Sequence, residues 1–230
     1  MSRSPYLLLT CEHASNALPP VFSDIVPPSI LKTHRAFDRG AQTLFSILRP
    51  LSAAAFQARY TRLLIDLNRS PDNEELFSRY TRHLSSHQKE ALIAGYYRPF
   101  REQVREAAEK IEQEHGRVLH VSVHSFTPIL RGKKRDVDVG FLYDPARPNE
   151  TELAKHWIKD LTRMEPGLVL RRNHPYRGVD DGHTTELRKQ VGARYAGVEL
   201  ELNQRFVRNP KRLHAIGLAL RQSLSAQVGR

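Results

Sequence analysis

Short apolar runs that end abruptly at polar residues recur along the chain and predict buried β-strands. A continuous apolar run of five or so residues is typical of a strand that is covered on both faces, as in a parallel sheet. We therefore expect a central sheet built from residues 6–10, 63–67, 118–123, 137–143, 168–170 and 197–202.

Apolar residues at helical spacing predict helices between these strands. The clearest pattern covers residues 86–115, and Gly116 is placed to end it. Pro99 removes a backbone donor inside this stretch and predicts a kink or a break. Further helices are expected over residues 38–48, 149–163 and 210–228.

The alternation of strands and helices favours an α/β fold. We expect three layers, with a mostly parallel or mixed twisted sheet and helices on both of its faces. Neither an internal repeat nor a Gly-, Ser- or Pro-rich linker divides the chain, so residues 1–230 are interpreted as a single catalytic domain.

Ionisable residues gather where the predicted strands end. In α/β sheets ligands bind beyond the carboxyl ends of the strands, so these residues are the candidates for chemistry. Two histidines and a carboxylate from separate strands form a common catalytic zinc site, and a further carboxylate near the zinc-bound water can act as general base. The candidates at these ends are Glu12, His13, residues 66–69, His124, Glu199 and Glu201.

Each candidate also has an ordinary structural interpretation, and the residues alone leave both open. A histidine at a strand end often makes only a structural hydrogen bond. Asp38 can cap the helix predicted to begin there. Glu199 and Glu201 lie on one face of their strand and can simply form a polar outer face.

Charge favours an anionic ligand. Lys and Arg total 36 against 25 Asp and Glu, a net charge of +11. The excess is spread along the chain, with one dense cluster at residues 131–135 and no interleaved aromatic residues of the kind that bind single strands. Nucleic acid is therefore an unlikely partner, although a non-catalytic nucleic-acid or anion-binding protein is the leading alternative outside enzymology. Salt-dependent binding in a gel shift would identify it.

Cysteine content and hydropathy indicate the compartment. Cys11 is the single cysteine, so no disulfide can form within the chain. The apolar run near the N-terminus is too short for a signal peptide or a membrane span. We expect a cytoplasmic protein that does not bind membranes.

Several short motifs resemble, in order and spacing, those of the N-formylglutamate amidohydrolase family. They are CEHASNALPP, HRAFDRGA, DLNRS, VHSFTP, GFLYD, NHPYRGVDDGHTTELR and GVELELNQRFV, spread over about residues 8 to 207. The resemblance implies a carboxypeptidase-like fold of the zinc-dependent exopeptidase or phosphorylase-hydrolase kind. It also implies a zinc-dependent amidohydrolase, related to succinylglutamate desuccinylases and aspartoacylases.

The resemblance also implies roles for the residues that match its motifs. His13 and His124 would be metal ligands, with Asp38 as the carboxylate ligand and Glu12 as the alternative. Glu201 would be the general base that takes a proton from a zinc-activated water. Glu199 is the alternative base if the register of the strand is shifted.

The substrate would be a small anionic N-formyl- or N-acyl-amino acid such as N-formylglutamate. Arg69, beside Asn68, would hold its carboxylate, and Arg177 is a second candidate. The family has an arginine two residues after the base where this chain has Asn203. This difference leaves room for a related metal amidase or peptidase with another acylated substrate. The metal would be zinc or another divalent ion, because sites with N and O ligands accept several of them.

Overall fold

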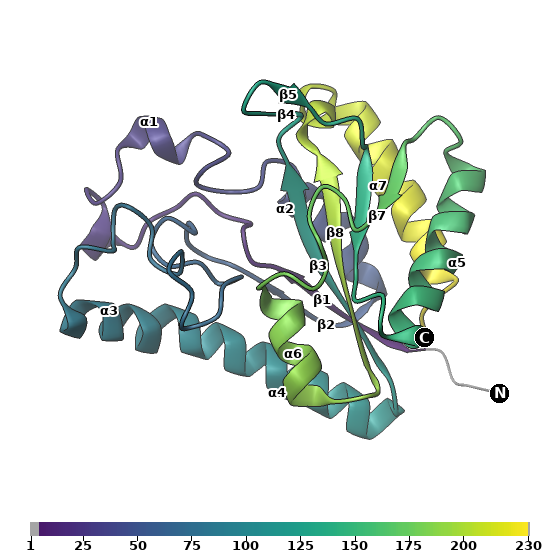
Figure 1. The fold of residues 1–230 in the computed structure, drawn as a ribbon, viewed down its shortest axis with the longest axis horizontal. Helices are drawn as coiled ribbons and strands as arrows, with labels where there is room; N and C mark the ends of the chain where they lie inside the picture. The colour runs from purple at the N-terminus through teal and green to yellow at the C-terminus, as the bar shows by residue number, and fades with distance from the viewer. Residues whose placement is uncertain (1–4, 230) are drawn as a thin grey trace.

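The computed structural model describes residues 5–229 and has a six-stranded sheet at its centre (Figure 1). The strand order is β2-β1-β3-β8-β6-β7, and every neighbouring pair is parallel except β6 and β8. The predicted α/β fold with a mixed sheet is confirmed. The sheet strands are β1 (Tyr6–Cys11), β2 (Ser52–Gln57), β3 (Val118–Phe126), β6 (Val139–Leu142), β7 (Leu170–Arg172) and β8 (Tyr195–Asn203).

Two sets of helices cover the two faces of the sheet. Alternate residues of β1 point to opposite faces, so Leu9 packs with α2 (Ala41–Leu48), α5 (Pro148–Met164) and α7 (Pro210–Ser225). Leu8 packs on the other face with α4 (Arg98–His115), and Leu187 of α6 (His183–Val191) joins the same cluster. The expected helical layer on each face is therefore present.

The long helix is not interrupted at Pro99, but its winding changes just before it. The stretch divides into α3 (Ser86–Leu92), one π-helical segment, η3 (Ile93–Tyr97), and α4, with the proline in the first turn of α4. Proline has no N–H to donate, so the usual hydrogen-bond pattern of an α-helix cannot continue unchanged through this position. The remaining short elements are η1 (Pro20–Phe22), α1 (Pro28–Leu31), η2 (Arg49–Leu51), η4 (Gln204–Arg208) and a hairpin of β4 (Ile129–Leu130) and β5 (Lys133–Lys134).

The prediction of a strand over residues 63–67 is wrong. This segment forms turns, and Leu64, Ile65 and Leu67 pack in a small cluster with Leu76 and Leu92. The edge strand next to β1 is β2 instead. Its Ser-Ala-Ala-Ala sequence is half-buried and poor in β-branched residues, so it lacks the apolar run by which the other strands are recognised.

Residues 12–40 and 58–97 form a lobe beside the sheet, seen at the left of Figure 1. It consists of loops with η1, α1, α3 and η3, and it holds apolar clusters of its own. The segment that was expected to be a strand therefore belongs to this lobe. Among residues 5–229, no helix combines the length and apolar character that crossing a bilayer requires.

Candidate active site

Three side chains from separate parts of the chain meet where β1 and β3 end. His13 follows β1, His124 lies near the end of β3, and Asp38 lies on the loop before α2. One potential ligand atom from each lies within 4.8 Å of the other two, and all three residues are buried. Two imidazoles and one carboxylate are a typical donor set for Zn²⁺, so these residues fit a divalent metal ion.

The position of Asp38 explains why it does not cap α2. Its backbone N–H donates to the His13 carbonyl (2.9 Å), and its Oδ2 accepts from the backbone N–H of Ser125 (3.1 Å). The cap position of α2 is occupied by Gly40, without a side-chain hydrogen bond. Asp38 thus joins the loop before α2 to the ends of both histidine-bearing strands.

His13 is fixed with Nδ1 towards the cluster. Its Nε2 lies 2.6 Å from Oδ1 of Asp66, and its Nδ1 accepts from the guanidinium of Arg62 (3.1 Å). The proton therefore resides on Nε2, where the Asp66 carboxylate accepts it. A carboxylate behind a histidine in this way orients the ring and raises its basicity as a metal ligand.

His124 presents the same nitrogen to the cluster. Its Nδ1 lies 3.1 Å from Oδ2 of Asp38, while its Nε2 lies 2.8 Å from Oγ of Ser122. Burial alone would lower the pKa of His124, but the hydrogen bond and charge of Asp38 and the charge of Glu12 raise it to about 10. Metal binding at Nδ1 would have to displace this proton.

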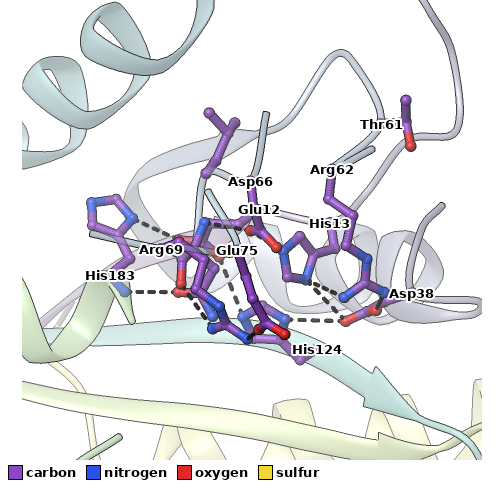
Figure 2. Close-up of polar contacts among 12 residues, drawn as sticks. Glu12, His13, Asp38, Thr61, Arg62, Asp66, Arg69, Glu75, His124 and His183 are labelled. Carbon is purple, nitrogen blue, oxygen red and sulfur yellow. Dashed lines mark hydrogen bonds and ion pairs between the residues drawn. The ribbon is translucent and has the colours of Figure 1, made fainter. Parts of the chain in front are cut away.

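Glu12 does not join the cluster. Its carboxylate is fully buried, and it accepts hydrogen bonds from Oγ of Ser122 (2.6 Å) and Nδ1 of His183 (2.8 Å). In Figure 2 a dashed line joins it to His183. The geometry therefore favours Asp38 over Glu12 as the carboxylate next to the two histidines.

Arg62 adds a cation to the same site. Its guanidinium forms an ion pair with Asp38 and also donates to the backbone carbonyl of His34 (3.1 Å). Burial would raise the pKa of Asp38, but the charge of Arg62 and the hydrogen bond from His124 hold it well below its usual range. Asp38 is therefore ionised, as a metal ligand must be.

Glu201 faces the cluster from the neighbouring strand. It pairs with His124 in the β3–β8 register, and it is buried with no hydrogen-bond partner for Oε2. Burial raises the pKa of Glu201 to about 8, with Asp38 and Glu199 adding to the rise and His124 opposing it. An unpaired carboxylate with a pKa near neutrality has the properties of a general base.

Glu199 lies two residues away on the same face but is engaged differently. It is half-buried and accepts a hydrogen bond from Oγ1 of Thr184 (2.7 Å). Asn203, further along, is buried and donates to the backbone carbonyl of Val137 (2.8 Å) while it caps η4. The residue that differs from the family pattern therefore has a structural contact away from the cluster.

A cavity of about 650 Å³ opens over the cluster. Asn68 lies in its wall and accepts from the backbone N–H of His183 (2.7 Å), which leaves its amide donors available. Arg69 is half-buried and is held by the Asp181 carbonyl (3.2 Å) and by Glu75 (3.6 Å). Arg177 also lines the cavity, but its side chain is exposed.

Arg62, Ser122 and the contacts of His183 are not predicted by the sequence pattern. With residues 63–67 read as a strand, Arg62 stood at the far end of that strand from the site. In the folded turn it lies beside Asp38 instead. Ser122 is two residues before His124 on a strand, and this spacing places both side chains on one face.

Comparison with known proteins identifies relatives over the whole fold. The sequence profile of the family described as N-formylglutamate amidohydrolase matches residues 5–224. A gene product of Agrobacterium tumefaciens has a similar crystal structure, with a TM-score of 0.79, 27% identity, and coverage of 96% of this chain and 91% of that one. No curated protein matches the chain in sequence.

A second crystal structure shares the fold at lower identity. It is the N-formylglutamate amidohydrolase of Ralstonia eutropha, with a TM-score of 0.74 and 19% identity, covering 99% of this chain and 95% of that one. At this identity the likeness supports the shared fold.

Proposed function

The chain belongs to the N-formylglutamate amidohydrolase family, and on this premise we propose that it is a zinc-dependent hydrolase of N-formyl- or N-acyl-amino acids such as N-formylglutamate. One observation supports this proposal most strongly. The cluster of His13, Asp38 and His124 and the carboxylate of Glu201, whose Oε2 has no hydrogen-bond partner, occur at the same site. Membership of this family itself indicates an amidohydrolase.

His13, Asp38 and His124 would hold the metal ion. A bound zinc ion polarises an amide carbonyl and lowers the pKa of a water molecule to about 7. Glu201 would take the proton of the attacking water and return it to the departing amine. Its pKa of about 8 allows it to do both near neutral pH.

Arg62 would stabilise the negative charge that develops on the amide oxygen. Its guanidinium lies beside Asp38 and lines the same cavity. A fixed donor aimed at developing charge in a water-poor site is a large contribution to catalysis. Burial would lower the pKa of Arg62, but the charges of Asp38 and Asp66 raise it, so the donor stays charged.

Asn68 and Arg69 would hold the carboxylate end of the substrate. A guanidinium suits a carboxylate because it donates two parallel hydrogen bonds. Arg177, at the exposed rim, would add a weaker attraction. Binding of this far end fixes the amide against the attacking water.

A metal analysis followed by a substrate screen tests the proposal. The purified protein should contain close to one divalent ion per chain and release amine from at least one N-formyl-, N-acetyl- or N-succinyl-amino acid. A protein that binds no divalent metal would contradict the proposal. A metal-loaded protein that is inactive on every small substrate would favour larger acylated substrates, for which a cavity of 650 Å³ has room.

A further inference from the structure

Buried polar groups that the proposed chemistry leaves unused form a chain behind His124. His183 donates from Nδ1 to Oε1 of Glu12 (2.8 Å), and Ser122 donates from Oγ to Oε2 of Glu12 (2.6 Å). The Ser122 oxygen then lies 2.8 Å from Nε2 of His124. All four side chains are nearly or fully inaccessible to solvent.

The direction of these hydrogen bonds is determined at Ser122. A hydroxyl has one proton, and here the Glu12 carboxylate, which can only accept, receives it. The oxygen of Ser122 must therefore accept from His124, so Nε2 of His124 carries its proton. Nδ1 is therefore the nitrogen of His124 that is available to a metal ion at this site.

Both oxygens of the Glu12 carboxylate are hydrogen-bonded, one by His183 and the other by Ser122. A buried ionised carboxylate is tolerated only where it is fully hydrogen-bonded, as it is here.

We propose that Glu12 is a positioning residue, which acts through Ser122 to hold the ring of His124 with Nδ1 facing the metal site. This inference rests on the proposed function, because it assigns a metal to the cluster of His13, Asp38 and His124. Glu12 supports His124 as Asp66 supports His13. The difference is that Asp66 contacts its histidine directly, whereas the hydroxyl of Ser122 lies between Glu12 and His124. Glu12 is thus not a ligand itself.

A second set of hydrogen bonds in the same strands offers a matched control. Oγ1 of Thr10 lies 2.7 Å from Nε2 of His120, and Nδ1 of His120 lies 2.6 Å from the hydroxyl of Tyr195. Thr10 and Ser122 are both fully buried, and they lie opposite each other in the β1–β3 register. Only Ser122 contacts a residue of the cluster.

The experiment compares zinc affinity, by competition with a chromogenic chelator, in Ser122→Ala and Thr10→Val. Thermal unfolding of the metal-free proteins reports the general cost of losing a buried hydroxyl. We expect Ser122→Ala to bind zinc about 10- to 100-fold more weakly than wild type, the usual effect of removing such a support. Thr10→Val should stay within about threefold of wild type even where its melting temperature falls equally.

Glu12→Gln and the double variant test whether Glu12 acts through Ser122. Glu12→Gln should also weaken zinc binding, and adding Ser122→Ala to it should weaken binding little further, because the two residues form one pathway. If Ser122→Ala binds zinc as tightly as wild type, or if the two losses multiply, the proposal is overturned. A wild-type protein that binds no zinc would instead contradict the proposed function.

Discussion

The two sides of the cavity are built in different ways. The side that carries His13, His124 and Glu201 rests on strand ends; all three side chains are buried, and fixed partners orient the two histidines. The side that carries Arg69 and Arg177 rests on loops, and its guanidinium groups are half-buried or exposed. Side chains on strand ends are positioned precisely enough for bond cleavage. Side chains on loops are positioned less precisely, which is sufficient to attract an anionic substrate.

Metal removal is expected to have the largest effect on the strand-built side. Dialysis against a strong chelator should abolish amide hydrolysis, and added Zn²⁺ should restore it, because the remaining groups cannot activate water at neutral pH. Circular dichroism of the metal-free protein serves as the control for folding. Undiminished turnover without metal would show that the cluster is structural.

Glu201→Gln should lower kcat by about 10²- to 10⁴-fold, because the general base is lost while the shape is kept. Metal content, measured on the same sample, should not change. Glu199→Gln is the matched control, since it lies on the same face of β8 but is already hydrogen-bonded to Thr184. A larger loss in Glu199→Gln than in Glu201→Gln would transfer the role of base to Glu199.

Arg62→Ala should lower kcat by about 10²- to 10³-fold, the usual loss when one donor to a developing oxyanion is removed. Arg82, an exposed residue in the wall of the same cavity, provides the control. Arg82→Ala should change kcat little. If Arg62→Ala raised only KM, Arg62 would instead belong with the substrate-holding residues.

Arg69→Lys should raise KM about 10-fold with a smaller change in kcat, because a planar two-pronged donor becomes a point charge. Arg177→Lys should have a smaller effect still, since its side chain is exposed to solvent. Steady-state kinetics on the best substrate of the screen measures both. If the two substitutions raised KM equally, Arg69 and Arg177 would contribute equally to substrate binding, which would contradict this prediction.

The last prediction concerns the free energy of unfolding in acid rather than catalysis. Burial, with the charge of His183 adding to it, lowers the pKa of His120 from 6.5 to about 3. Below pH 6.5 the unfolded chain takes up a proton that the folded protein does not, so the free energy of unfolding decreases as pH falls towards 3. The contribution of His120 is about 1.4 kcal/mol per pH unit in that interval.

Urea unfolding of the metal-free protein between pH 6.5 and 4.5 measures this slope. His183, whose pKa burial and the charge of Arg101 lower to about 4, contributes in the same direction. The slope should be shallower in His120→Gln than in wild type. An identical slope in both proteins would show that His120 is protonated in the folded state.

The sequence predicted the sheet where the strands carry apolar residues and are buried along almost their whole length, and this part of the site with it. Val118–Phe126 and Tyr195–Asn203 are such strands, and they carry His124 and Glu201 to the same edge. β2 was missed because an alanine-rich edge strand has no such pattern. Residues 63–67 were misread because a small cluster inside the lobe buries an apolar run as completely as a sheet does.

Contacts between distant side chains lay beyond the sequence pattern. Glu12 and His183 are 171 positions apart, and no sequence pattern indicates that Nδ1 of His183 donates to Glu12. The same holds for Arg62, whose partner Asp38 lies 24 residues earlier on another loop. Such pairs depend on how loops return to the strand ends, and loop paths follow from tertiary packing rather than from local propensity.

The lobe's separate apolar clusters have a consequence for how such a protein evolves. Leu64 and Leu76 pack with one another there, apart from the clusters on the two faces of the sheet. Substitutions that reshape the lobe therefore leave the packing of the sheet intact. Because His13, Asp38 and Arg62 also lie in this lobe, only substitutions in its apolar clusters and outer loops, away from these three residues, can alter the shape of the cavity without disturbing the metal-site cluster.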